Sequence, residues 1–238
     1  MANDAAERST PVGRRMFLGL LGAGAAGVLW GAQVQRWLED NVGPILDKDP
    51  TGLAQQLPIG RFRLYTVTGD YPYQEPDVYK LRVGGLVDNP VELTYDDLLA
   101  YEPLNFTKDF QCVTGWRVHD VEWRGVKLAD ILDDAGVQEA ATALQFTSFD
   151  GVYTESLTLE QARRDDVMVA YQMLGGDISN EHGGPVRLYV APMYGYKSIK
   201  WLDGIDATAE VIPGYWEELG YDVDAWIGES NGRDDDPV

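Results

Sequence analysis

The chain has 238 residues, of which 45% are hydrophobic, and its 39 acidic and 19 basic side chains give a formal net charge of −20 at pH 7. This length and apolar share are typical of one globular domain with its own core. So negative a chain argues against nucleic acid as a partner. Acidic residues scattered along the chain, with only six lysines, favour a halophilic protein whose charge is screened by salt.

Residues 1–32 have the features of an export signal. Arg14 and Arg15 precede an apolar stretch, Gly19 to Gly31, which is shorter than the ~20 residues of a spanning helix. The pattern resembles a twin-arginine signal, which implies recognition by the twin-arginine translocase and export to the outer face of the cytoplasmic membrane or the exterior. Small residues in the stretch offer a cleavage site, and an uncleaved membrane anchor stays open as the alternative.

Within this stretch, Gly22-Ala23-Gly24-Ala25-Ala26-Gly27 matches the glycine pattern of dinucleotide-binding folds. That pattern works between a strand and a helix, with a second strand and an acidic residue about 20 positions on. Here it follows an arginine pair, and residues 41–50 have Pro, Gly and charges where the second strand should be. A nicotinamide enzyme is therefore poorly supported.

The rest of the chain predicts a spacer and one folded body. Three prolines punctuate residues 33–60, which predicts an irregular spacer. The body is expected over residues 61–212. Short β-rich runs beside turn residues predict strands, at Phe62–Val67, Tyr79–Val83, Leu144–Phe149 and Val186–Val190.

Helices are fewer than strands. Apolar residues at helical spacing predict helices over Thr94 to Ala100 and Leu128 to Ala135, and Thr158 with Gln161 has the form of a capping box. Because strands and helices do not alternate, the predicted class is α+β, mixed and β-rich. Residues 213–238 are expected to pack three aromatic side chains on the body, Trp216, Tyr221 and Trp226, and to end in a disordered acidic tail, Asp234 to Asp236.

Cys112 is the only cysteine of the chain and has no partner for a disulfide. A lone cysteine is usually a small buried hydrophobe; the alternative is a thiolate ligand to a soft metal. One Cys and two His are too few for a closed zinc or iron–sulfur site. A metal here would have to bring most of its own coordination, as a pterin-dithiolene molybdenum centre does.

The segment from His182 to Leu202 concentrates the features of an anion pocket. Its glycines let backbone N–H groups approach a phosphate, Ser198 offers a hydroxyl, and three cations supply charge, namely Arg187, Lys197 and Lys200. The alternative is a strand, a turn and a solvated basic edge. Three cations within fourteen positions of so acidic a chain favour the pocket.

These segments, together with Val169 to Gly175, resemble the molybdopterin-binding domain of the sulfite oxidase family. The resemblance runs from Arg61 to Ile212 and includes the bacterial branch of protein-methionine-sulfoxide reductase catalytic subunits. It implies a molybdenum–molybdopterin cofactor and oxygen-atom transfer on a small oxyanion or sulfoxide substrate. It also implies a separate redox partner, with a membrane haem protein as one possibility.

The resemblance also implies roles for single residues. Cys112 would be the thiolate on molybdenum, and the cofactor would be held by seven further residues: Thr147, His182, Arg187, Lys197, Ser198, Ile199 and Lys200. Asp70 departs from the asparagine of the reductase branch. Arg117 stands where sulfite oxidases bind the anionic substrate, and Tyr153 near their active-site tyrosine. A surface arginine and a packed strand tyrosine are the alternatives.

Two functions are compatible with this pattern. The haem and dimerisation domains of full sulfite oxidases are not expected in 238 residues, so the architecture resembles the free-standing reductase subunit. The rival is a non-catalytic, membrane-anchored module of the same fold that only binds an anion. Cys112 favours the enzyme, because a pure binding module has no need of a thiolate.

Overall fold

A computed structural model describes residues 62–238. The predicted signal over 1–32 and the spacer over 33–60 lie outside the described residues. Within 62–238, the strands form two five-stranded sheets, and none of the helices is long and apolar enough to cross a membrane.

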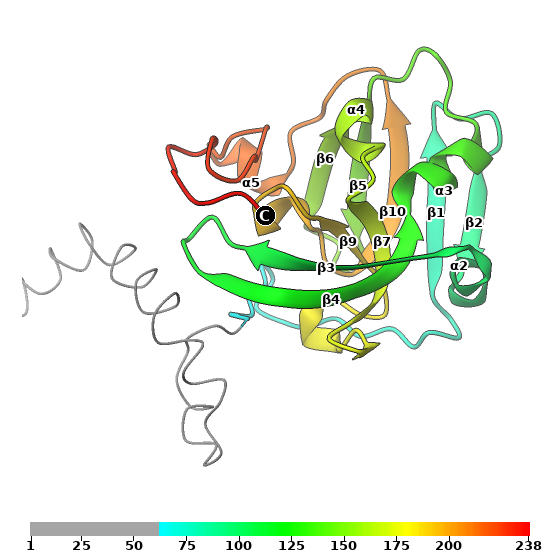
Figure 1. Cartoon of the computed structure of the whole chain (residues 1–238). Coiled ribbons are helices and arrows are strands. Elements are labelled where there is room, and N and C mark those ends of the chain that lie inside the picture. Colours follow the sequence, from blue (N-terminus) through cyan, green and yellow to red (C-terminus); the bar gives the residue numbers. More distant parts are fainter. Residues whose placement is uncertain (1–61) are drawn as a thin grey trace, which may run out of the picture.

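The first sheet has the strand order β2-β1-β10-β5-β6 (Figure 1). Its members are β1 (Lys80–Gly85), β2 (Val91–Thr94), β5 (Ala143–Ser148), β6 (Thr154–Thr158) and β10 (Leu202–Thr208). β1 runs parallel to β10, and the other pairs are antiparallel. The parallel pair joins the two ends of the domain, because about 120 residues separate β1 from β10.

The second sheet is built around β7 (Val167–Met173), which is buried at six of its seven positions. It pairs with β4 (Arg117–Lys127), β8 (Gly176–Asp177) and β9 (Arg187–Val190), and β4 forms a long hairpin with β3 (Pro103–Gln111). A side chain at Gly125 would place its Cβ only 2.2 Å from the Val169 carbonyl oxygen. Glycine there allows the hairpin to bend onto β7.

The helices are short. They are α2 (Tyr95–Ala100), α3 (Leu128–Ala135), α4 (Leu159–Ala162) and α5 (Tyr215–Glu218), with the 3-10 turns η2 (Asn180–His182) and η3 (Gly195–Lys197). The helices predicted from Thr94 and Leu128 are confirmed, and so is the capping box of Thr158 and Gln161. These ends are encoded locally, so the sequence predicts them well.

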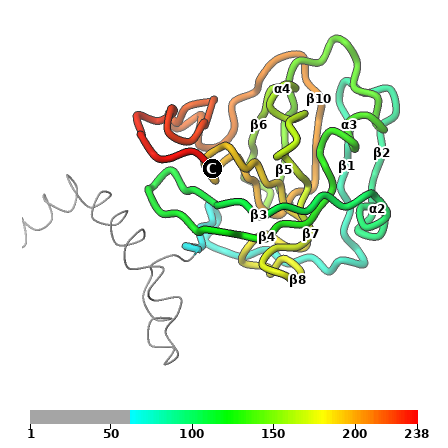
Figure 2. The backbone as a smooth tube through the Cα atoms, viewed as in Figure 1, coloured from blue at the N-terminus to red at the C-terminus, as the bar shows by residue number. Residues whose placement is uncertain are grey.

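The predicted mixed, β-rich α+β fold is confirmed, as are three of the four predicted strands, in β1, β5 and β9. The fourth, Phe62–Val67, is wrong: this segment is irregular and pairs with neither sheet. Its β-prone side chains instead pack on other aromatic rings, with Phe62 5.2 Å from Phe110 and 6.1 Å from Trp116 between ring centroids. Figure 2 shows the segment in cyan, running on from there to β1.

The acidic end of the chain is ordered, contrary to the prediction. Asp235 is buried; it pairs with Arg233 at 2.6 Å and accepts a hydrogen bond from the Tyr194 hydroxyl at 2.8 Å. The aromatic side chains of this region, Trp216, Tyr221 and Trp226, pack against the main core as predicted. The C-terminal segment therefore folds back on the body, because its carboxylates find buried partners there.

Candidate active site

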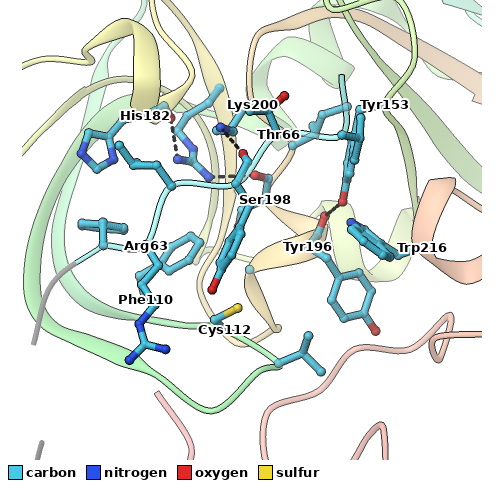
Figure 3. Close-up of a pocket in the computed structure, with 18 of the residues that line it drawn as sticks. Arg63, Thr66, Phe110, Cys112, Tyr153, His182, Tyr196, Ser198, Lys200 and Trp216 are labelled. Carbon is cyan, nitrogen blue, oxygen red and sulfur yellow. Dashed lines mark hydrogen bonds between the residues drawn. The ribbon is translucent and has the colours of Figure 1, made fainter. Parts of the chain in front are cut away.

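A cavity of about 350 Å³ lies between the β3–β4 turn, the loop around η3 and the segment 62–67 (Figure 3). Aromatic and aliphatic side chains form most of its wall. Figure 3 places Cys112 on one side, with Ser198 and Lys200 across the cavity and Tyr153 and Trp216 along a third side. Concave, mostly apolar sites with a few convergent polar groups are the usual form of a ligand site.

Cys112 sits at the first position of the turn that joins β3 to β4. Its N–H donates to the Trp116 carbonyl, and Gly115 N–H donates to the Cys112 carbonyl, both at 2.9 Å. Gly115 has φ +103°, a conformation that favours glycine. Burial raises the pKa of the Cys112 thiol, and the hydrogen bond from Thr114 Oγ1 to Sγ, 3.2 Å long, opposes this. A bound metal would supply the charge that the thiolate needs.

Arg187 is the most buried cation of the cavity wall, with 3% of its surface exposed. Its guanidinium donates to three carbonyls, those of His182 at 2.6 Å, Ser198 at 2.8 Å and Leu188 at 3.4 Å. It also lies over the rings of Phe110 and Trp123, 5.5 and 5.6 Å from their centroids. Burial lowers the pKa of Arg187 to about 10. None of these partners carries a negative charge.

Lys200 is a second cation without a carboxylate partner. Its ammonium donates to the carbonyls of Tyr65 at 2.7 Å and Glu181 at 3.2 Å, and lies 4.0 Å from the centroid of the Trp201 ring. Burial, followed by the nearby charge of Arg187, lowers the pKa of Lys200 to about 7. The same two causes lower the pKa of His182 to about 4, so this imidazole is neutral at pH 7.

This arrangement fits a molybdopterin. Neither Arg187 nor Lys200 forms a salt bridge with any carboxylate of residues 62–238, although the chain carries a net charge of −20. Two desolvated cations without a counterion favour an anion such as a phosphate. Residues 62–238 contain no cluster of three or more His, Cys, Asp or Glu able to hold a metal. A metal bound by Cys112 would therefore need a cofactor that supplies its other ligands.

Seven of the predicted site residues line the cavity: Cys112, Tyr153, His182, Arg187, Ser198, Ile199 and Lys200. The Tyr153 hydroxyl donates to the Tyr196 carbonyl at 2.7 Å, so it is held by the wall and not free in the cavity. The Ser198 hydroxyl accepts from Val190 N–H at 3.0 Å. The motifs around Cys112, Arg187 and Lys200 are thus brought together from separate parts of the chain.

Three predicted residues lie outside the cavity wall, which corrects the sequence-based set. Lys197 is fully buried between Glu155 and Glu217. Thr147 donates its hydroxyl hydrogen to Asp203 at 2.7 Å. Both side chains, of Lys197 and Thr147, contact a carboxylate from an element distant in the sequence. The residues next to them in the sequence do not indicate these partners.

Arg117 also differs from its predicted position. Its Nε donates to Gln111 Oε1 at 2.6 Å, and its Nη1 lies 3.4 Å from Asp109 Oδ2. A further hydrogen bond joins it to the Asp236 carbonyl. These contacts tie the hairpin to the C-terminal segment, so the charge of Arg117 is used in structure and not in the cavity.

The sequence-based search missed the segment 62–67 and Trp116. Phe62, Arg63, Leu64 and Tyr65 all line the cavity. Nothing in this segment indicates a ligand site by itself, because it contributes through its path across the cavity. Trp116 carried a weak signal, four residues after Cys112.

The comparison with protein families decides the class. The family described as "Oxidoreductase molybdopterin binding domain" matches residues 68–216. The chain belongs to this family. It is therefore an oxidoreductase whose family binds molybdopterin, as the resemblance of its motifs implied.

Individual relatives agree with this assignment. The chain is 39% identical over 162 residues to "Uncharacterized oxidoreductase YuiH" of Bacillus subtilis, covering 67% of this chain and 81% of that protein. It is 31% identical to a sulfite oxidase of Arabidopsis thaliana (60% of this chain, 45% of the relative). It is 29% identical to the "Protein-methionine-sulfoxide reductase catalytic subunit MsrP" of Gluconobacter oxydans (68% and 57%). The match spans less than two thirds of the last two proteins.

A solved structure shares the fold. The sulfane dehydrogenase SoxCD from Paracoccus pantotrophus aligns with a TM-score of 0.55 and 25% identity, covering 60% of this chain and 41% of the solved one. The sheet-rich architecture of residues 62–238 is thus the sulfite-oxidase-type molybdopterin-binding fold.

Proposed function

We propose that the protein is an exported molybdoenzyme that transfers an oxygen atom to or from a small sulfur compound, with Cys112 as the protein ligand to molybdenum. The observation that carries this proposal is a pair of cations in the cavity wall, buried Arg187 and half-buried Lys200, which share one cavity with a thiol and have no carboxylate counterion. The rival, a non-catalytic anion-binding module, needs the cations but not the thiol.

The chain's own residues divide the work. Arg187, Lys200 and the Ser198 hydroxyl would hold the phosphate end of the cofactor, and Cys112 the metal end. The bound cofactor supplies two-electron oxygen-atom chemistry. Tyr153 and the other aromatic side chains form a wall that orients a small substrate and limits the entry of water. A separate redox partner would supply two electrons when the substrate is reduced and accept two when it is oxidised, and a membrane haem protein is one candidate for this partner.

The position of Arg117 favours a neutral sulfoxide as the substrate. An arginine committed to Gln111, Asp109 and the Asp236 carbonyl is not available to a dianion in the cavity. The methionine-sulfoxide reductase relative supports the same choice. Sulfite stays the second candidate, because Arg63 also lines the cavity and could meet an anion.

Elemental and pterin analysis of protein purified from its own host tests the proposal. We expect one molybdenum and one pterin per chain. Cys112→Ser should reduce turnover to background while the pterin stays bound, because the phosphate grip is on the other side of the cavity. Stoichiometric zinc, or full activity in the serine variant, would exclude the metal-ligand role.

A kinetic comparison separates the two substrates. With an artificial electron carrier, Arg117→Gln should leave the KM for a sulfoxide unchanged and weaken the fold slightly. The loss of one charge-assisted hydrogen bond corresponds to a rise in KM of about 10- to 100-fold. If the wild type oxidises sulfite and this variant raises the KM for sulfite by that factor, Arg117 does contact the substrate.

The export signal and the domain limits are proposed from the sequence. We propose that residues 1–32 form a twin-arginine signal or anchor, 33–60 a spacer, 61–212 the catalytic domain and 213–238 its C-terminal segment. Replacing Arg14 and Arg15 by lysine should leave the protein in the cytoplasm, because that route reads the arginines themselves. Cell fractionation of both forms measures this, and unchanged export would refute the signal.

A further inference from the structure

Lys197 lies between two carboxylates, one more than its charge can neutralise. Its ammonium donates to Glu155 Oε1 at 2.7 Å, to the Ser156 carbonyl at 2.8 Å and to Glu217 Oε1. The three charged side chains are fully buried. They come from three elements, β6, η3 and α5. We call Lys197, Glu155 and Glu217 the carboxylate clamp.

The charge count of the clamp is unfavourable if both acids are ionised. A buried net charge of −1 would then remain, and no other cation of residues 62–238 pairs with either acid. Two carboxylates that share one buried site cannot both ionise easily, so one of them keeps a proton.

The hydrogen bonds indicate which acid keeps it. Glu217 has donors at both oxygens, Lys197 at Oε1 and Gly214 N–H at Oε2, as expected of a carboxylate. Glu155 has donors only at Oε1, from Lys197 and from Ser156 N–H. Its Oε2 is buried without a partner, and so is the neighbouring Ser156 hydroxyl. A proton on Oε2 would remove charge from this oxygen and turn it into a donor.

We propose that Glu155 is a neutral carboxylic acid in the folded protein, so that the two acids of the clamp hold one proton between them. In this state the clamp positions Tyr153 and Tyr196, two tyrosines of the cavity wall. Lys197 stands between Tyr196 and Ser198, which both line the cavity. Tyr153 lies two positions before Glu155, on the same side of the extended chain. The clamp therefore fixes both ends of the hydrogen bond from Tyr153 to the Tyr196 carbonyl, visible as a dashed line in Figure 3.

Gly214 lets the C-terminal segment come close enough to close the clamp. A Cβ at this position would lie 2.7 Å from the Thr154 carbonyl oxygen and 2.8 Å from both Glu155 Cα and Glu217 Oε2. These are distances that real Cβ atoms do not adopt next to backbone. A glycine is thus required where α5 meets β6.

Electrostatics support a neutral Glu155. Burial raises the pKa of Glu155 well above 4.5, Lys197 opposes this, and Glu217 adds to it. The other titratable groups that face the acid are Tyr153 and Tyr196, and burial raises the pKa of both hydroxyls. An acid with a raised pKa in the folded state contributes stability that is full below the unfolded value and is lost as the pH rises through the folded one.

Thermal unfolding of the full-length holoprotein between pH 5 and 8, at constant salt, tests the protonation. Glu155→Gln copies the neutral acid, so its Tm should equal or exceed that of the wild type, by a margin that grows with pH. In Glu217→Gln the remaining acid ionises to pair with Lys197, so the loss should be small. The double variant leaves the ammonium unpaired and should lower Tm by on the order of 10 °C, more than the two single changes combined.

The matched control is Glu160→Gln, an exposed acid five residues after Glu155 on the adjoining helix, which should leave Tm unchanged. Infrared spectroscopy at pH 7 should show a protonated carboxyl band that both single clamp variants lack. A Glu155→Gln variant that loses as much Tm as Glu217→Gln at every pH, or a wild type without this band, would overturn the shared proton.

The positioning role rests on the proposed function and has its own readout. At a temperature where it stays folded, the double variant should keep its molybdenum content and lose turnover per molybdenum. Gly214→Ala, which opens the clamp without changing any charge, should do the same. Unchanged turnover per molybdenum in both would refute positioning. A wild type without turnover would instead refute the proposed function, while the unfolding and infrared results stand.

Discussion

Two lysines three positions apart, Lys197 and Lys200, have opposite environments in this protein. Lys197 is buried against two carboxylates, whereas Lys200 donates only to carbonyls. In a chain with 39 acidic residues, carboxylates are available almost everywhere. A half-buried cation such as Lys200 without a carboxylate partner is therefore informative, because the missing negative charge is left for a ligand.

The same contrast distinguishes stability from binding. Lys197 of the clamp has its carboxylate partners within the protein, so its charge serves the fold without a ligand. The cations of the cavity wall are a cost to the apoprotein, since burial lowers the pKa of both Arg187 and Lys200. An anion in the cavity would offset that cost, which couples cofactor binding to stability.

The largest expected effect is on folding. Lys197→Met should lower the Tm of both apoprotein and holoprotein by on the order of 10 °C, because removing one partner of a buried ion pair leaves the other uncompensated. Scanning calorimetry measures this. A loss of less than about 2 °C would mean that Lys197 is not held in an ion pair. The contrast drawn between Lys197 and Lys200 would then be wrong.

The next effect is on cofactor retention. Lys200→Met should weaken the grip on the phosphate end by about 10- to 100-fold, the value of one charge-assisted hydrogen bond. The pterin left after dialysis measures it. In contrast to Lys197→Met, this variant should not destabilise the apoprotein, since it removes a half-buried charge without a counterion. Full pterin retention would place the phosphate elsewhere.

A pH titration of the apoprotein sharpens the contrast further. The pKa of Lys200 is lowered to about 7 in the folded state against 10.5 in the unfolded one. The unfolded state therefore binds more protons between these values, and the wild type should gain stability over Lys200→Met as the pH rises from 7 to 10. Bound cofactor should flatten this difference. Parallel melting curves of the two apoproteins across this range would contradict it.

The smallest expected effect is that of salt on the difference in Tm between the two lysine variants. We expect the Tm of every variant to rise with KCl into the molar range, because salt screens repulsion among the exposed carboxylates. The gap between Lys197→Met and Lys200→Met should change little, since buried pairs are screened much less. A Tm that is flat or falls with KCl would refute the halophilic interpretation, and a gap that closes would mean that the clamp is open to solvent.

The sequence alone determined the elements and motifs that depend on neighbouring residues. The helix that begins after Thr94, the one that ends at Gly136 and the capping box of Thr158 are set by hydrogen bonds within a few positions. The cysteine turn and the glycine-rich motif before Arg187 likewise pointed to the family and to seven residues of the cavity wall.

Only the tertiary structure decided which charges face the cavity. Lys197 looked equivalent to Lys200 because both follow the same glycine-containing loop, but Glu155 and Glu217 lie 42 and 20 positions away. Arg117 was assigned to the substrate, yet its partner at Asp236 is 119 positions distant. Such pairs depend on how the sheets, the hairpin and the C-terminal segment pack together. In the low-dielectric interior, the interaction of a buried charge with its partner is strong, and it depends on their distance in space and not on their separation in the sequence.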